Sequence, residues 1–131
     1  MTQTAPKPAR PLSPHLQVYK PQMTSVLSIL HRITGIGLSV ALPVLVWWLV
    51  ALSQGAESYQ AALNCLKSPL GKLFLMGWAW ALSYHLCAGI RHLLWDAGWG
   101  FDLKQVYASA KVLLAVSTLL TLILWFAILG A

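Results

Sequence analysis

The sequence predicts an all-α integral membrane fold with three transmembrane helices. Of its 131 residues, 58% are hydrophobic and only 9% are charged, whereas about a quarter of the residues in a soluble domain are charged. Three windows contain no Lys, Arg, Asp or Glu: residues 33–53, 73–90 and 112–131. Each is close to the roughly 20 residues with which a helix crosses the bilayer core. Apolar runs of this length lack the alternation of barrel strands, so helices remain as the way to satisfy the backbone.

The first 23 residues predict a separate surface arm. They hold five of the chain's seven prolines, which prevent one continuous helix. We expect residues 1–23 to lie on the cytoplasmic surface of the membrane, ahead of a membrane anchor domain at residues 24–131. The prolines are Pro6, Pro8, Pro11, Pro14 and Pro21.

The anchor domain is expected to contain helices at about residues 25–52, 70–96 and 105–130. Thr24 or Ser25 is a suitable N-cap for the first helix, because its hydroxyl can accept a hydrogen bond from a free backbone N–H. Three short helices share little core, so we expect the fold to be completed by transmembrane helices of another chain. Small residues would let those helices approach closely: Gly35, Gly37, Ala81, Ala88 and Gly89.

The distribution of charge predicts the orientation in the membrane. Basic residues gather before the first helix and around the second loop, which the positive-inside rule places in the cytoplasm. The first loop and the C-terminus are then periplasmic, although Lys67 and Lys72 oppose this assignment. No signal or transit peptide is recognised, so we expect a bacterial inner membrane, with the mitochondrial inner membrane as the alternative. The net charge of +6 is spread along the chain without a nucleic-acid-binding motif, so no nucleic-acid partner is expected.

The first helix carries polar residues at its cytoplasmic end. At 100° per residue, Ser28, Arg32 and Ser39 share one stripe, with His31 on its flank. One interpretation is that Arg32 and His31 extend to lipid headgroups as ordinary cations. The other is that a hydroxyl and a guanidinium together hold an anionic or carbonyl-bearing ligand at the interface.

The second helix carries a stripe at the spacing i, i+4, i+7 and i+11. Its members are His85, Gly89, His92 and Asp96. His85 is about 16 Å from Asp96 along the axis and is therefore deep in hydrocarbon. Ionisable residues there are costly and usually functional, and histidine is an axial ligand of haem iron. The alternative is a histidine hydrogen-bonded to a neighbouring helix.

One haem cannot take both axial ligands from this helix. His85 and His92 are about 10.5 Å apart on the same side, whereas two axial nitrogens face each other across one iron. His15 and His31 are expected too close to the cytoplasmic edge, so a partner chain is expected to supply the second ligand.

Further polar residues gather at the cytoplasmic ends of the first two helices. Each is either an ordinary solvated cation or one of a group that neutralises two haem propionates. The group consists of His31, Arg32, Arg91 and His92, and Asp96 is able to pair with Arg91, His92 or Lys104.

Two longer stretches then carry a resemblance. Residues 10–34, RPLSPHLQVYKPQMTSVLSILHRIT, and residues 85–98, HLCAGIRHLLWDAG, match two signatures in the order expected. The first ends in Ser-x-x-His-Arg-x-Thr, and the second contains His-x3-Gly-x-Arg-His followed by aromatic-Asp. The chain therefore resembles the succinate dehydrogenase cytochrome b subunit family over nearly its whole length.

The resemblance implies one of two membrane anchors in a four-subunit complex, alongside an iron–sulfur subunit and a flavoprotein subunit. It implies that the anchors share one haem b and help to reduce ubiquinone. By residue, His85 is the axial haem ligand and the second histidine belongs to the other anchor. The remaining residues match the quinone site (Ser28, Arg32, Ile29 and Leu16), the haem edge (His31, Arg32 and His92) and supporting positions (Arg91 and Asp96).

The sequence leaves two other functions open and disfavours a third. A haem-free structural anchor would keep the same helices, and the anchor of a quinol:fumarate reductase would share the signatures. A small cation transporter is disfavoured, because such proteins need a carboxylate within the membrane and the acids here lie near or beyond the helix ends.

Overall fold

The computed structural model describes residues 19–130 and, within them, only helices. There are four: α1 (Met23–Ser53), α2 (Ala56–Lys67), α3 (Pro69–Asp96) and α4 (Leu103–Gly130). Three of them, α1, α3 and α4, are long and apolar enough to cross a membrane, which confirms the predicted fold class. Most of the predicted arm, including Leu16, lies outside the described residues.

Helix α1 begins one residue before the predicted caps. Gln22 is the N-cap, with no side-chain capping bond, so the assignment of Thr24 or Ser25 is wrong. Both lie inside the first turn, and the Ser25 Oγ instead accepts from the Tyr19 hydroxyl at 3.1 Å. Pro43 lies within α1, which continues to Ser53.

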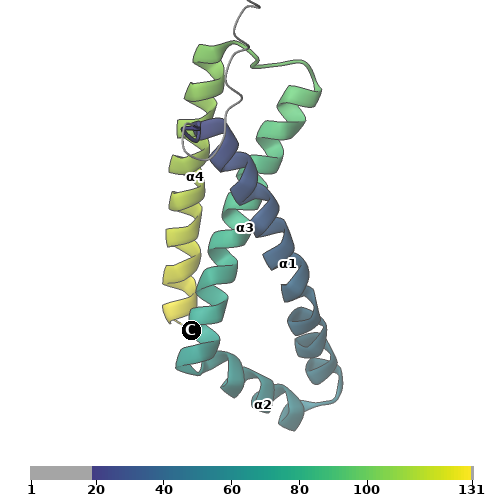
Figure 1. Ribbon diagram of the computed structural model, residues 1–131. Coiled ribbons are helices and arrows are strands. Elements are labelled where there is room, and N and C mark those ends of the chain that lie inside the picture. The colour runs from purple at the N-terminus through teal and green to yellow at the C-terminus, as the bar shows by residue number, and fades with distance from the viewer. Residues whose placement is uncertain (1–18, 131) are drawn as a thin grey trace, which may run out of the picture.

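Helix α2 occupies a stretch that we had predicted to be part of a loop. It lies across the ends of α1 and α3, so that these three helices outline a triangle (Figure 1). Gly55 begins the turn into α2 with a φ of 104°, a conformation that residues with a Cβ rarely adopt. The Trp48 and Tyr59 rings then hold α2 against α1, with centroids 6.1 Å apart.

The junction between α2 and α3 is a tight corner. Ser68 caps α3 by accepting from the Gly71 backbone N–H at 3.1 Å, and its hydroxyl donates to the Cys65 carbonyl at 2.6 Å. Pro69 occupies the first turn of α3, where its missing N–H costs nothing. A Cβ at Gly71 would collide with the Cys65 and Leu66 carbonyls.

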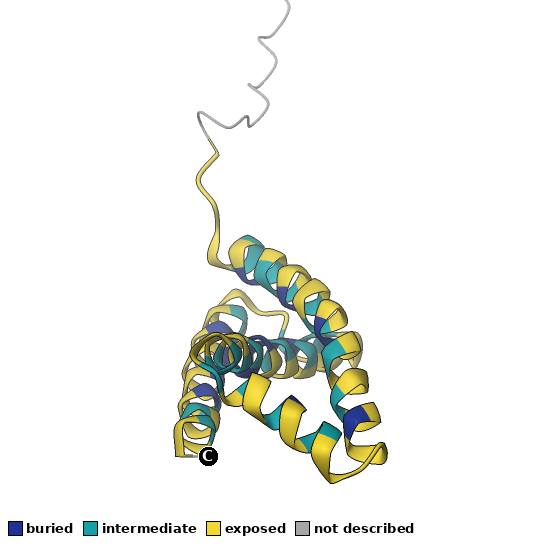
Figure 2. Cartoon of the chain, turned by 90° about the horizontal axis from the view of Figure 1, so that it is seen from below, coloured by how far each residue is buried: buried dark blue, intermediate teal, exposed yellow. Residues whose placement is uncertain are grey.

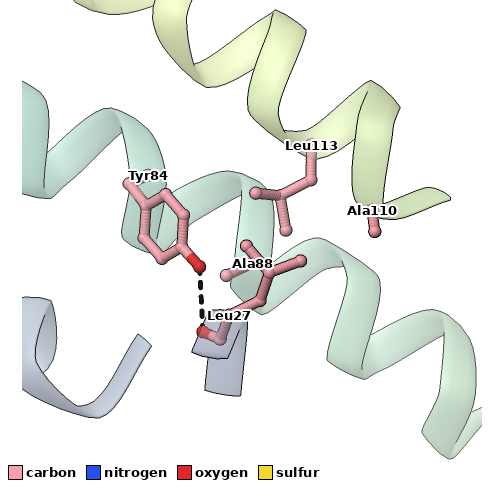
Figure 3. Close-up of a cluster of buried hydrophobic side chains, with 5 residues drawn as sticks. All are labelled: Leu27, Tyr84, Ala88, Ala110 and Leu113. Carbon is pink, nitrogen blue, oxygen red and sulfur yellow. Dashed lines mark hydrogen bonds between the residues drawn. The ribbon is translucent and has the colours of Figure 1, made fainter. Parts of the chain in front are cut away.

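The buried core lies where α1, α3 and α4 meet. It consists of Leu27, Tyr84, Ala88, Ala110 and Leu113 (Figure 3). The Tyr84 hydroxyl donates to the Leu27 carbonyl at 2.8 Å and ties α3 to α1. Small side chains at this junction allow the backbones to approach closely, as is typical of membrane helix pairs.

Most residues of the chain are exposed (Figure 2), and many of them carry large apolar side chains. In water such a surface would be an aggregation liability, but in a bilayer it contacts lipid or other helices. Trp125 of α4 packs inward, and its Nε1 donates to the Met76 carbonyl of α3 at 2.8 Å.

Candidate functional site

Three imidazoles from α1 and α3 lie side by side. The His31 ring lies between the other two, with centroids 4.2 Å from His85 and 5.0 Å from His92. The expectation that His31 lies much nearer the cytoplasmic edge than His85 is therefore wrong. Because α1 begins at Met23, His31 is about 12 Å into that helix, and His85 is about 16 Å from the end of the antiparallel α3. The two depths nearly coincide.

The tautomer of His85 follows from its contacts. Its Nδ1 is 3.1 Å from the His31 carbonyl oxygen and 3.3 Å from the Thr34 Oγ1. A carbonyl oxygen only accepts, so this contact assigns the proton to Nδ1 and leaves the lone pair on Nε2. A ring nitrogen that donates to a backbone carbonyl while the other nitrogen is free is the usual arrangement of a metal-ligating histidine.

Two neighbours on α1 fix the His85 ring. The Thr34 hydroxyl donates to the Leu30 and His31 carbonyls at 2.9 and 3.0 Å, which places its oxygen beside the His85 Nδ1. One residue further, a Cβ added at Gly35 would lie 3.0 Å from the His85 Cε1. Glycine at this position therefore leaves space for the imidazole. The sequence indicates only that Gly35 is small and indicates no contact for Thr34, because spacing along one helix does not show which residues of a second helix lie nearby.

His31 has an unsatisfied nitrogen. Its Nε2 is buried and has no hydrogen-bond partner among the described residues. Buried polar atoms are normally paired, so this nitrogen fits a site completed by a group outside the chain. No cluster of three or more His, Cys, Asp or Glu residues able to hold a metal ion is found in the described part of the chain. A metal held by His85 would therefore need further ligands from elsewhere.

The predicted quinone residues lie on the open side of α1. Ser28 is half-buried, Arg32 is exposed, and Ile29 is 56% exposed. Ser28 and Arg32 are one helical turn apart, as predicted, so they share a face. Their exposure means that other subunits would have to complete any pocket there.

Arg91 does not join the residues that were expected to neutralise the haem propionates. It is only 7% exposed, and it donates from Nε to the Ser109 Oγ and from Nη2 to the Val106 carbonyl, both at 2.9 Å. Its guanidinium carbon also lies 4.0 Å from the centroid of the Trp95 ring. These contacts engage Arg91 with α4, and the structure does not join it to the three imidazoles. No sequence signal had pointed to Ser109.

Of the remaining predicted residues, His92 joins the stack and Asp96 does not. The His92 ring also meets Trp95 edge-on, with centroids 5.3 Å apart. Asp96 is the exposed last residue of α3.

The family model described as "Succinate dehydrogenase/Fumarate reductase transmembrane subunit" matches residues 6–124. The chain belongs to this family. It is similar to the succinate dehydrogenase cytochrome b556 subunit of Rickettsia prowazekii, with 46% identity over 116 residues, covering 88% of this chain and 90% of the relative. The b556 subunit of Paracoccus denitrificans is 44% identical over 120 residues, covering 89% and 92%. The b560 subunit of Reclinomonas americana is 37% identical over 121 residues, covering 88% and 84%.

Family membership confirms the resemblance drawn from the two signatures. The three long apolar helices and the family together make the chain a multi-pass membrane subunit. As a member of this family, it is one part of an enzyme complex and is not catalytic alone.

Proposed function

We propose that this chain is the cytochrome b anchor of a succinate dehydrogenase, in which it binds haem b and helps to form the ubiquinone-reduction site. The supporting observation is the contact between the His85 Nδ1 and the His31 carbonyl, which leaves Nε2 as a ligand. Relatives at 44–46% identity are named cytochrome b556 subunits. A haem-free anchor would not need an imidazole inside the membrane that is oriented by the His31 carbonyl and given space by Gly35.

The haem would be shared between two anchor subunits. His85 would supply one histidine ligand to the iron and the second anchor the other, because His92 is about 10.5 Å from His85 on the same side of α3. His31 and His92, stacked beside His85, together with Arg32 of the next position on α1, would hold the propionates by charge and hydrogen bonding. When bound, the haem supplies a centre that accepts and returns one electron at a time.

The quinone would lie against the cytoplasmic end of α1. The Ser28 hydroxyl donates a hydrogen bond to one quinone oxygen, which orients the ring. The Arg32 guanidinium stabilises the negative charge that develops on oxygen as electrons arrive, before protons are taken up. Ile29 and Leu16 contribute apolar walls. Since Ile29 and Arg32 are exposed in this chain, the remaining walls come from partner subunits.

The proposed partners supply the cofactors that this chain has no residues to bind. It has two cysteines, fewer than the four that an iron–sulfur cluster usually requires, so the electrons have to come from a separate iron–sulfur subunit. A flavoprotein subunit would oxidise succinate, and the second anchor would complete the membrane domain. With the N-terminus in the cytoplasm of a bacterium, the quinone site faces those soluble subunits, and α2 lies on the periplasmic surface.

The haem assignment is tested by replacing the proposed ligand. His85→Ala is expected to abolish the Soret band of the purified complex, while the membrane subunits still copurify with the soluble ones. His92→Ala is the comparison, because His92 lies beside His31 but cannot face the same iron; it should weaken haem binding through the propionates without abolishing the Soret band. A complex that has no Soret band before substitution, or that keeps it in His85→Ala, would indicate a haem-free anchor or another ligand.

A further inference from the structure

An apolar cavity of about 490 Å³ lies between α1, α3 and α4. Its α1 and α3 walls belong to the halves of those helices that lead to α2. Its walls include Leu38, Leu42 and Leu45 of α1, Leu75 and Trp78 of α3, and Leu124 of α4. Neither the haem nor the quinone assignment uses any of these residues.

A second cavity of about 330 Å³ adjoins the first one. The two share Leu75, Leu124 and Ile128, so they are continuous along α3 and α4. The second cavity adds Lys67 from the last turn of α2 and Lys72 from the first turn of α3. The combined space is therefore apolar along its length and positively charged at the membrane surface.

The two lysines are the residues that oppose the positive-inside rule. On the periplasmic side, basic residues near helix ends are disfavoured, yet Lys67 and Lys72 lie five positions apart there and line one cavity. No carboxylate lines either cavity with them. An anion at the level of the lipid headgroups would be the complementary partner for this pair. A ligand in this space would thus meet positive charge at the membrane surface and apolar walls below it.

We propose that the two cavities form a binding site for one anionic glycerophospholipid of the periplasmic leaflet. Its phosphate lies at Lys67 and Lys72, and one acyl chain fills the larger cavity. The order of these groups along α3 is the order of the same groups in the lipid. The site is independent of the haem and quinone assignments.

The two lysines favour a lipid over a helix of a partner subunit. No carboxylate lines either cavity with them, and the phosphate of a lipid headgroup is an anion at the level where they lie.

The test uses the purified, delipidated complex and native mass spectrometry. Phosphatidylglycerol and phosphatidylcholine with identical acyl chains are titrated separately. Each lysine near an anionic headgroup is worth about a five-fold change in affinity, so the wild type should prefer phosphatidylglycerol by about thirty-fold. Lys67→Gln with Lys72→Gln should remove that preference. Lys104→Gln with Lys111→Gln, on the opposite side of the membrane, is the matched control and should keep it.

One further variant tests the apolar contribution. Leu42→Trp fills the cavity from a residue that is 58% exposed, and should weaken both lipids. The proposal is overturned if the lysine pair variant binds phosphatidylglycerol as the wild type does, or if a photo-crosslinker at Leu42 captures the second anchor instead of lipid.

Discussion

The region where α1 and α3 cross differs from the region where α2 holds them apart. At the crossing, polar groups meet between helices: the Tyr84 hydroxyl bonds the Leu27 carbonyl, and the His85 imidazole bonds the His31 carbonyl. On the α2 side, the facing walls are apolar and enclose a cavity. A hydrogen bond between helices fixes the position of a side chain. Apolar walls do not fix the position of a molecule that lies between them. The residues proposed to bind haem thus lie where the helices are joined by directional contacts.

The largest effect expected at the crossing concerns Arg32. Arg32→Leu should lower quinone reduction by about 100-fold or more, because it removes a donor aimed at developing charge. Succinate oxidation with an artificial dye acceptor should be nearly unchanged, since that reaction bypasses the membrane. Both rates are measured on the same purified complex. Arg32→Lys keeps the positive charge but loses the planar guanidinium, so its rate of quinone reduction should lie between those of the wild type and Arg32→Leu. Equal loss of both activities in Arg32→Leu would indicate an assembly defect instead.

A smaller effect is expected where Gly35 leaves space for the His85 ring. The new Cβ of Gly35→Ala would lie 3.0 Å from the His85 Cε1, so the imidazole has to shift. Displacing a group that orients a metal ligand typically costs about 10- to 100-fold in affinity, so haem content should fall and the haem midpoint potential should change.

Gly37→Ala is the control for that prediction, because a Cβ there meets nothing within 4 Å. Both substitutions improve helix propensity equally, and only Gly35→Ala should alter the haem. Identical haem content and potential in the two variants would contradict the role of Gly35.

The smallest effects compare one interhelical hydrogen bond from each region. Tyr84→Phe removes the bond from α3 to α1, and Trp125→Phe removes the bond from α4 to α3. Hydrogen bonds between membrane helices average about 0.6 kcal/mol, so each variant should lose about that much stability in detergent unfolding. Only Tyr84→Phe should also change the haem spectrum, because Tyr84 adjoins His85. A spectral change in Trp125→Phe as well would show that the two regions are not independent.

The transmembrane helices could be predicted because hydrocarbon imposes a simple rule on composition. Helix α2 could not, since its twelve residues are too short and too polar to carry that signal. Its boundaries are set instead by Gly55 and by the Ser68–Pro69 corner, which from sequence alone indicate only that the chain turns.

The candidate site could be predicted as a set of residues on single helices but not as a set of contacts between helices. Spacing placed Ser28 with Arg32, and His85 with His92, on common faces. It did not place His31 against His85, because that depends on where α1 begins and where it crosses α3. Arg91 shows the same limit, since its partner Ser109 lies on a helix whose register the sequence does not reveal.

The triangle formed by α1, α2 and α3 has a mechanical consequence. Its base, α2, is about 18 Å long, and a triangle whose sides have fixed lengths also has fixed angles. The angle at which α1 meets α3, and with it the distance between the His31 and His85 rings, is therefore set partly by α2, which joins the far ends of both helices (Figure 1). Each residue added to α2 would lengthen the base by about 1.5 Å, so the length of this short helix affects the spacing of the residues proposed to bind haem.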